Sequence, residues 1–499
     1  MIEEKFFITK QKKILFIFEL ANNHNGSLEN ALKLIEDAKS ISNFTNLEFG
    51  FKLQFRNLDT FLHKDCEKMN NKHVKRFIET KLTQKEYKEI CEKIKKVGFK
   101  LVITPFDEES VDFAKECEVD ILKIASCSNT DWPLIEKVSK QDLPVIASTG
   151  GIDIDKIDNL SSYFSHQNVP LAILHCVSVY PTIDPKRFNM NFIKKMIKRY
   201  PKNLIGYSGH EQENDFLPSI SAVSSGAKII ERHFSNLDER NKYSISKNKL
   251  NELLSELNKL IDVLGEEEKV LQPDEIHSIN MLQRGIYAKH LIKKENEDIK
   301  KSVYLAFPKS SGDQLSPGDL SKNISVSSNV DIDEAVYGKV EDKKKYLVRK
   351  YVHRYKFLLQ EAGIFPGEDC QAELSHHFGL EKIEKFGAFI ATIVNGVYCK
   401  KIICMFPGQY HPRHQHFKKI ETFHILYGDL DLIKDDVSYK LRVGDKIDVL
   451  NNEWHEFSSK NGCVFEEIST ESLRKDSNYF DQEIQKQDIV DRKTFVTLY

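Results

Sequence analysis

The sequence predicts an α/β protein with a (β/α)8 TIM barrel, then a small β-rich domain and a C-terminal all-β barrel. Eight short apolar segments alternate with helix-like stretches over roughly the first 265 residues. Turn signals recur about every ten residues between 280 and 340. From about residue 370, strand-like segments and turns alternate again. Strands separated by helices are typical of a closed parallel barrel, whereas strands separated by turns are typical of antiparallel domains.

The eight predicted barrel strands end in polar residues that are capable of chemistry. They are KILFIFE (13–19), FGFKLQF (49–55), KLVITPF (100–106), DILKIAS (120–126), PVIASTG (144–150), LAILHC (171–176), NLIGYSGH (203–210) and AKIIERHF (227–234). The chemistry of a (β/α)8 barrel collects at the C-terminal ends of its strands. A purely structural barrel would not carry Lys, Glu, His and Ser at most of these ends, so the pattern predicts an enzyme.

Helix-like segments separate these strands. Residues 27–41 repeat apolar side chains at helical spacing, with Ser27 as the predicted N-cap. Similar segments precede the third, fourth and eighth strands, at 83–98, 107–118 and 214–227. Residues 248–265 predict the closing helix, which ends at Gly265. The longer polar segment 56–82 is a candidate lid.

Composition and charge exclude several classes of protein. The chain has 499 residues, and 73 basic residues nearly balance 75 acidic ones. A net charge of −2 leaves no electrostatic footprint for nucleic acid or for an anionic membrane. The nine cysteines form no CxxC pair, which predicts reduced thiols and a cytoplasmic location. The N-terminus does not resemble a signal peptide, and no apolar stretch reaches the ~18 residues that span a bilayer.

Two charged segments, 266–275 and 341–363, divide the chain and are interpreted as linkers, the second of them helix-prone. The predicted domains are therefore the barrel (1–268), the β-rich domain (277–342) and the all-β domain (360–499).

Two histidines end neighbouring strands of the predicted barrel. His210 follows the seventh strand and His233 the eighth. Either histidine alone is more often a hydrogen-bonded core residue. Together at adjacent strand ends, with open positions left over, they favour a shared divalent cation that acts as a Lewis acid.

Two lysines and four hydroxyls would line the same rim of the barrel: Lys52, Thr104, Lys123, Ser126, Ser148 and Ser208. Two cations with several hydroxyl donors suit a phosphate and a carboxylate. The less favoured interpretation is that the lysines are solvated and the hydroxyls cap helices. Glu19, at the end of the first strand, is either a general base or the partner of a lysine, and both readings stay open.

Eight segments in order resemble the motifs of the sialic acid (N-acetylneuraminate) synthase family over about residues 12–240: FELANNHNGS, FKLQF, ITPFDEESV, LKIASCS, PVIASTGG, LHCVSVYPT, GYSGHE and ERHF. RGIYAKHLIKK and LSPGDL resemble that family's C-terminal antifreeze-like (SAF) domain. Members are transferases that join phosphoenolpyruvate to the aldehyde of an amino-hexose, giving phosphate and a nine-carbon 3-deoxy-2-ulosonic acid. The resemblance thus implies this reaction, and also a homodimer that swaps its antifreeze-like domains.

The resemblance also implies roles for individual residues. Phosphoenolpyruvate would contact Lys52, Thr104, Lys123, Ser126, Ser148 and Ser208. His210 and His233 would hold Mn2+ or Mg2+, and Glu19 would lie near the reacting carbons. The implied catalytic residues are Glu19, Lys52, Lys123, His210 and His233. The sugar would contact Gln54, Ser128, Tyr180 and Glu231.

The chain departs from the family pattern mainly where the sugar is bound. Ser128 stands where a Glu is usual, Ser178 replaces an asparagine, and the SDH motif has become SGH through Gly209. RNKYSIS replaces a GPD-type stretch, and LAFPKSSGD lacks the arginine expected for the N-acetyl group. These changes imply a retained reaction with an acceptor other than simple N-acetylmannosamine, such as a 2,4-diacetamido-trideoxyhexose.

The C-terminal domain carries a metal-binding pattern. The cupin motif G-x5-H-x-H-x4-E-x6-G is matched by Gly408, His414, His416, Glu421 and Gly428. Most of the second cupin motif is also present, with His455 as its histidine. Histidines at i and i+2 on one strand point to the same face. These three histidines and Glu421 therefore predict a second divalent metal site for Zn2+, Mn2+, Fe2+ or Ni2+, with a cupin that has lost its metal as the alternative.

Two other functions stay open. One is a metal-dependent sugar aldolase or isomerase, which would need no phosphate pocket. The other is a degenerate barrel that serves as a scaffold for a cupin that senses or isomerises a sugar. The scaffold alternative stays open because Ser128 stands where the family usually has a Glu.

Overall fold

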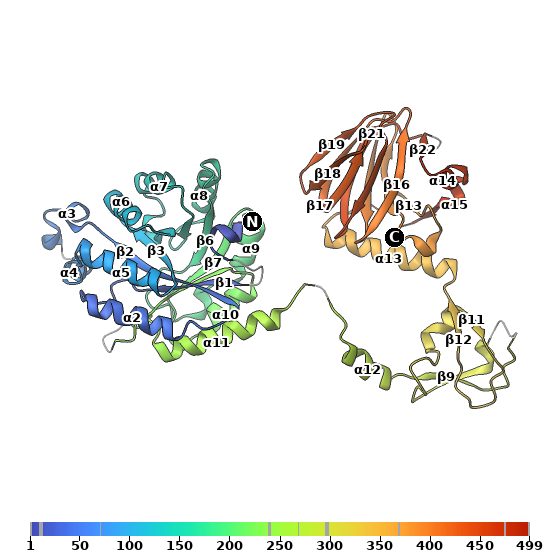
Figure 1. Ribbon diagram of the computed structural model, residues 1–499, viewed down its shortest axis with the longest axis horizontal. Helices are drawn as coiled ribbons and strands as arrows, with labels where there is room; N and C mark the ends of the chain where they lie inside the picture. The colour runs from blue at the N-terminus through green and yellow to red at the C-terminus, as the bar shows by residue number, and fades with distance from the viewer. Residues whose placement is uncertain are drawn as a thin grey trace. The chain divides into compact units, whose positions relative to one another are not determined.

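The computed structural model describes residues 2–8, 13–69, 71–237, 241–267, 269–294, 299–367, 370–473 and 476–497. The chain divides into two compact units, Met1–Lys269 and Val270–Tyr499 (Figure 1). Among the helices of these described ranges, none combines the length and the apolar character needed to cross a bilayer.

The first unit confirms the predicted (β/α)8 barrel. Its eight strands are parallel and close in sequence order: β1 (Ile14–Glu19), β2 (Leu47–Phe55), β3 (Lys100–Pro105), β4 (Ile121–Ile124), β5 (Val145–Ser148), β6 (Leu171–Cys176), β7 (Leu204–Gly209) and β8 (Ile229–His233). Pairing of β1 with β8, from Leu15 opposite Ile229 to Glu19 opposite His233, closes the barrel.

Alternation along each strand decides which side chains reach the barrel interior. In β1, Leu15 and Ile17 belong to the core cluster inside the barrel, whereas Phe16 and Phe18 pack in the cluster between strands and helices. Glu19 continues the inward series at the C-terminal end. By the same rule, Ile229, Glu231 and His233 share the inward face of β8.

Helices surround the strands (Figure 1). They are α2 (Leu28–Ser40), α5 (Gln84–Lys96), α6 (Glu108–Glu116), α7 (Trp132–Ser139), α8 (Ile154–His166), α9 (Asn191–Arg199), α10 (Leu217–Ser224) and α11 (Lys247–Leu264). Ser27 caps α2 by accepting a hydrogen bond from the Asn30 N–H, as predicted. The candidate lid contains α3 (Leu58–Phe61), a 3₁₀ turn and α4 (Lys72–Glu79), and its closing motion stays a prediction.

The second unit begins with α12 (Pro273–Met281) and two small antiparallel sheets. One sheet pairs β9 (Gly285–Ala288) with β10 (Val303–Ala306), and the other pairs β11 (Asn323–Val326) with β12 (Gly338–Glu341). Buried side chains of the sheets and their connections, including Ile286, Val326 and Val336, form a separate hydrophobic cluster. This separate core supports our proposal that 277–342 is a domain of its own.

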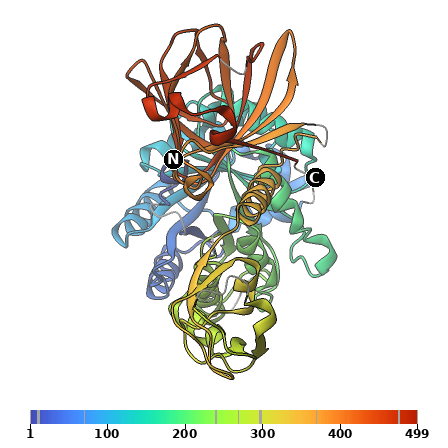
Figure 2. The ribbon, with the colours of Figure 1, turned by 90° about the vertical axis from the view of Figure 1, so that its right-hand side faces the viewer.

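The rest of the second unit is an antiparallel half-barrel, residues 371–496 (Figure 2). Its strands are β13 (Gln371–Ser375), β14 (Ala388–Asn395), β15 (Tyr398–Met405), β16 (Gln409–His416), β17 (Glu421–Lys434), β18 (Val437–Arg442), β19 (Lys446–Val449), β20 (His455–Ser459), β21 (Cys463–Thr470), β22 (Ser477–Tyr479) and β23 (Lys493–Val496). Two short helices, α14 (Gln482–Lys486) and α15 (Ile489–Arg492), precede the last strand. The predicted all-β character is confirmed.

The segment 341–363 is not a linker. It forms helix α13 (Lys344–Glu361), and Tyr351, Tyr355 and Leu359 of this helix belong to the hydrophobic cluster of the half-barrel. The Tyr355 ring stacks on Phe406 with 3.8 Å between centroids. High charge concealed this apolar face, so we place the start of the third domain near residue 344 rather than 360.

Candidate functional site

Glu231 lies between the two predicted lysines at the rim of the barrel. Lys123 Nζ donates to both Glu231 carboxylate oxygens, at 3.0 and 2.8 Å, and Lys52 Nζ lies 2.9 Å from Oε2. The Ser208 hydroxyl donates to Oε1 at 2.8 Å. All four side chains are buried. The structure therefore brings Lys52, Lys123 and Ser208 together as predicted, and adds that Glu231 neutralises both lysines.

Glu19 is the second carboxylate of this cluster. It forms an ion pair with Lys52, which is one of the two roles that the sequence left open, and its role as a general base stays a prediction. Glu19 also accepts hydrogen bonds from the Ala21 N–H at 2.5 Å and from the Gln54 amide at 3.4 Å. Arg56 in turn donates to Gln54 at 2.9 Å. Charged and polar groups thus form one chain across the rim, from Arg56 to Lys123.

Burial shapes the charges of this cluster. Burial lowers the pKa of Lys52 to about 7, even though the Glu231 carboxylate favours the charged form. Burial raises the pKa of Glu231, but the two ammonium groups together outweigh it and hold that pKa well below its usual range. At neutral pH, Glu231 is therefore ionised, and the charged and neutral forms of Lys52 are close in free energy.

Two of the predicted hydroxyls have no hydrogen-bond partner among the described residues. Thr104 Oγ1 at the end of β3 and Ser148 Oγ at the end of β5 are buried without one. Ser126 differs, because its hydroxyl accepts from the Gly150 N–H at 3.1 Å and contacts Cys176 Sγ at 3.6 Å. Buried polar atoms are nearly always satisfied, so these two hydroxyls are available to a bound ligand or to ordered water.

His210 and His233 face each other with 5.2 Å between ring centroids. Nδ1 of His210 lies 3.1 Å from the Val177 carbonyl oxygen, which leaves its Nε2 lone pair available. Nδ1 of His233 is buried and has no hydrogen-bond partner within the described part of the chain. Burial lowers the pKa of His210 to about 4 and holds that of His233 well below its usual range. Two neutral imidazoles with available lone pairs fit a shared divalent cation.

Two tyrosines lie against this imidazole pair. The ring centroids of Tyr180 and His210 are 4.2 Å apart, and those of Tyr243 and His233 are 4.9 Å apart. The two phenol rings are 5.4 Å apart in a T-shaped arrangement. Tyr180 was implied as a sugar contact. No sequence pattern singles out Tyr243, because it lies in the irregular RNKYSIS segment rather than at a strand end.

Ser128 lies in a 3₁₀ turn that follows β4 and is buried. Its hydroxyl lies 4.0 Å from the Cys127 sulfur. It lies close to Ser126 in the chain, and its part in binding a sugar stays a prediction.

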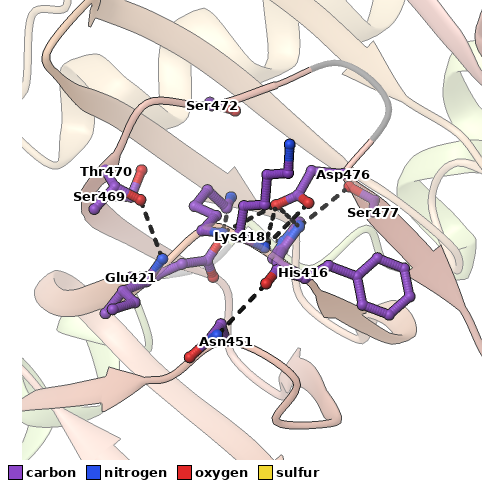
Figure 3. Close-up of polar contacts among 12 residues, drawn as sticks. His416, Lys418, Glu421, Asn451, Ser469, Thr470, Ser472, Asp476 and Ser477 are labelled. Carbon is purple, nitrogen blue, oxygen red and sulfur yellow. Dashed lines mark hydrogen bonds and ion pairs between the residues drawn. The ribbon is translucent and has the colours of Figure 1, made fainter.

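In the half-barrel, the structure brings the four predicted metal ligands together. Side-chain nitrogens of His414, His416 and His455 all lie within 4.8 Å of one another. Glu421 Oε1 is 3.1 Å from His416 Nε2 (Figure 3). Glu421 Oε2 is 3.6 Å from His455 Nε2. These residues come from β16, β20 and the first residue of β17. All four side chains are buried.

Backbone carbonyls orient two of these imidazoles. His414 Nδ1 lies 2.9 Å from the Pro412 carbonyl oxygen, and His455 Nδ1 lies 3.1 Å from that of Glu453. Such contacts fix the tautomer and direct Nε2 toward the centre of the cluster. Burial is the main cause that lowers the pKa of His414 and of His455, so both imidazoles are neutral at pH 7. Neutral imidazoles beside an ionised carboxylate are a donor set suited to a transition metal.

A buried lysine, not foreseen from the sequence, completes this cluster. Lys419 pairs with Glu421 and, at 3.0 Å, with Glu467, which in turn pairs with Lys401 at 3.0 Å. Asp476 accepts the N–H groups of Lys418 and Lys419 at 3.1 and 3.0 Å (Figure 3). Lys419 escaped notice because a lysine in the turn FKKIE ordinarily lies in solvent.

A model of the NeuB family matches residues 50–269. The chain is 30% identical to N-acetylneuraminate-9-phosphate synthase of Homo sapiens, over 56% of this chain and 79% of that protein. It is also 30% identical to N,N'-diacetyllegionaminic acid synthase of Campylobacter jejuni, over 57% of this chain and 87% of that one. A solved structure, spore coat polysaccharide biosynthesis protein E from Chromobacterium violaceum, is similar with a TM-score of 0.62 and 36% identity, over 65% of this chain and 98% of that one.

Proposed function

The chain belongs to the NeuB family of sialic acid synthases, and on that premise we propose that its barrel condenses phosphoenolpyruvate with an amino-hexose. The products would be phosphate and a nine-carbon 3-deoxy-2-ulosonic acid. One observation carries this proposal most directly. Two buried lysines on a shared carboxylate lie at the same barrel rim as a pair of neutral imidazoles.

Phosphoenolpyruvate would bind to Lys52 and Lys123. In the structure, Glu19 and Glu231 balance these two ammonium groups. An incoming phosphate adds negative charge and favours the protonated form of Lys52, whose pKa of about 7 lets it take up a proton on binding. The unpartnered hydroxyls of Thr104 and Ser148, with Ser126 and Ser208, would donate to phosphate and carboxylate oxygens.

His210 and His233 would hold Mn2+ or Mg2+, which when bound acts as a Lewis acid toward the sugar aldehyde. Tyr180 and Tyr243 would contact the sugar beside these imidazoles, and Gln54 and Ser128 would be further sugar contacts. The nucleophilic C3 of phosphoenolpyruvate would attack the aldehyde carbon, and the aldehyde oxygen would take up a proton to become a hydroxyl. Water would add at C2 with loss of a proton, and the C2–O bond to phosphate would then break. Glu19 would accept the proton of that water, and its contacts with Lys52 and Gln54 at the rim support this role.

We further propose that the half-barrel binds a second divalent metal (Zn2+, Mn2+, Fe2+ or Ni2+) through His414, His416, Glu421 and His455. Its orphaned His455 Nε2 and the Glu421 oxygens beside it are consistent with such an ion. The swapped homodimer of the family is likewise our proposal for this chain.

The decisive experiment incubates the full chain with phosphoenolpyruvate, Mn2+ and one acceptor at a time. N-acetylmannosamine is compared with 2,4-diacetamido-2,4,6-trideoxyhexoses, and phosphate release is followed together with mass spectrometry of the product. A nine-carbon acid that forms with the trideoxy sugars and disappears in the Lys123→Met variant supports the proposal. Fast turnover of N-acetylmannosamine alone would reject the altered acceptor. No consumption of phosphoenolpyruvate with any hexosamine would favour the scaffold alternative.

A further inference from the structure

Glu211 and Arg232 form a buried ion pair beside the imidazoles. Both side chains are 0% exposed. Arg232 Nη1 donates to Glu211 Oε1 at 2.6 Å, and Nη2 donates to the Glu211 carbonyl oxygen at 3.3 Å. The proposed reaction does not use either residue.

Strand alternation places this pair on the outer side of the barrel wall. Arg232 lies between Glu231 and His233 in β8, so its side chain points away from the interior that they face. Glu211 follows His210 directly in the chain. Each member of the ion pair is therefore covalently adjacent to one of the two imidazole-bearing residues.

The carboxylate of Glu211 is held on both oxygens. Tyr207 donates its hydroxyl to Oε2 at 2.9 Å, and Ser219 donates to Oε1 at 3.0 Å. The Thr182 N–H donates to the His210 carbonyl oxygen at 2.9 Å, which ties the same stretch of backbone to the β6 side. Directional bonds of this kind set the position of a strand end more narrowly than apolar packing does.

Gly209 makes room for the ion pair. A Cβ at this position would lie 2.3 Å from Glu211 Oε2, 2.8 Å from Tyr207 Cε1 and 2.9 Å from Arg232 Cδ. Any larger residue must displace the carboxylate or its partners. The SGH sequence, which stood as an unexplained departure, thus has a structural reason in this chain.

We propose that the Glu211–Arg232 ion pair positions His210 and His233 for one shared divalent cation. It links the ends of β7 and β8 and so sets the separation of the two imidazoles. This inference rests on the metal site in the proposed function. The proposed reaction uses neither side chain, and the pair lies outside the barrel interior, so both are positioning residues.

The test measures Mn2+ binding by isothermal titration calorimetry on the full chain without substrates. All variants carry His414→Ala and His416→Ala, so that the half-barrel does not contribute. We expect Glu211→Leu, Arg232→Met and Gly209→Ala each to weaken Mn2+ binding by roughly 10-fold, the lower end of the loss seen when a group bonded directly to a metal ligand is removed, because the ion pair acts on the imidazoles only through the backbone. Arg199→Met is the matched control, because it breaks an exposed ion pair with Asp158 on the same barrel.

The double variant Glu211→Leu/Arg232→Met separates positioning from stability. Replacing a whole buried ion pair with apolar groups is often neutral for folding. We expect a melting temperature near that of the parent but Mn2+ binding as weak as in the single variants. Arg232→Lys, which keeps the charge but not the forked geometry, should fall between parent and Arg232→Met.

Parent-like Mn2+ affinity in the double variant or in Gly209→Ala would overturn the inference. If the single variants unfold, Gly209→Ala still decides, because it moves the carboxylate and removes no charge. Mn2+ binding by the parent that His210→Ala does not abolish would also overturn it. In that case, product formation in the preceding experiment would still support the proposed function, so the two can fail separately.

Discussion

Replacement of Glu231 by Gln should destabilise the barrel and yet strengthen the binding of phosphoenolpyruvate. Glu231 accepts from Lys52, Lys123 and Ser208, and its side chain is 4% exposed. Among the described residues, it supplies the only carboxylate within ion-pair distance of Lys123, whereas Lys52 keeps Glu19. The variant therefore leaves one buried ammonium group unpaired.

The loss of stability can be estimated from this single unpaired ammonium group. Removing one partner of a buried pair costs about 3–5 kcal/mol, and we expect the lower end because Lys52 stays paired. A loss of about 3 kcal/mol lowers the folding equilibrium constant roughly 100-fold. For a unit of this size, it lowers the melting temperature by about 6–12 °C.

Thermal unfolding with and without phosphoenolpyruvate measures both parts of the prediction. Ligand at 100 times its Kd stabilises a protein by about 2.7 kcal/mol. At equal concentration of phosphoenolpyruvate, the melting temperature of the variant should rise more than that of the parent. The phosphate supplies the negative charge that Lys123 lacks, and the Glu231 carboxylate no longer repels it. Glu256→Gln, in an exposed ion pair with Lys259, is the control and should change stability by less than about 0.5 kcal/mol. A variant as stable as the parent, or one with weaker ligand binding, would refute the reasoning.

Three further predictions concern the same sites. Because the pKa of Lys52 is about 7, kcat/KM for phosphoenolpyruvate should fall about tenfold per pH unit above pH 7, and Lys52→Arg should flatten this limb of the pH profile. Tyr243→Ala should raise KM for the amino-hexose about tenfold without changing KM for phosphoenolpyruvate, whereas Tyr243→Phe should stay near the parent; equal effects on both substrates would argue against a sugar contact. Replacing His414 and His416 together by Ala should remove one metal ion per chain by elemental analysis and leave the synthase rate unchanged, and a lost rate would instead give the half-barrel a catalytic part.

Much of the rim could be predicted from the sequence because parallel barrel strands all end at the same rim. A side chain at the end of an apolar strand therefore faces its counterparts on other strands, whatever the helices between them contain. Lys52, Lys123, His210 and His233 were placed together in this way. Histidines at i and i+2 likewise defined the half-barrel cluster, since a strand turns alternate residues to the same face.

Other features were beyond prediction because they depend on which side chains meet across the fold. The contact of Glu231 with a sugar stays a prediction, but its pairing with lysines from β2 and β4 could not be predicted from the sequence. Helix α13 was interpreted as a linker because its charges conceal a narrow apolar stripe that only the half-barrel covers. Lys419 lies in a turn that would ordinarily be solvated, and two carboxylates from other strands bury it.

The sequence by itself determined the barrel, the half-barrel and the chemical types gathered at each site. These follow from periodicity and spacing within single strands, which are local properties of the chain. Tertiary structure alone decided the pairing of charges, the aromatic contacts of Tyr243 and the ion pair of Glu211 with Arg232. Such contacts depend on barrel closure and strand register, which bring together residues far apart in the chain with a geometry that no local pattern encodes.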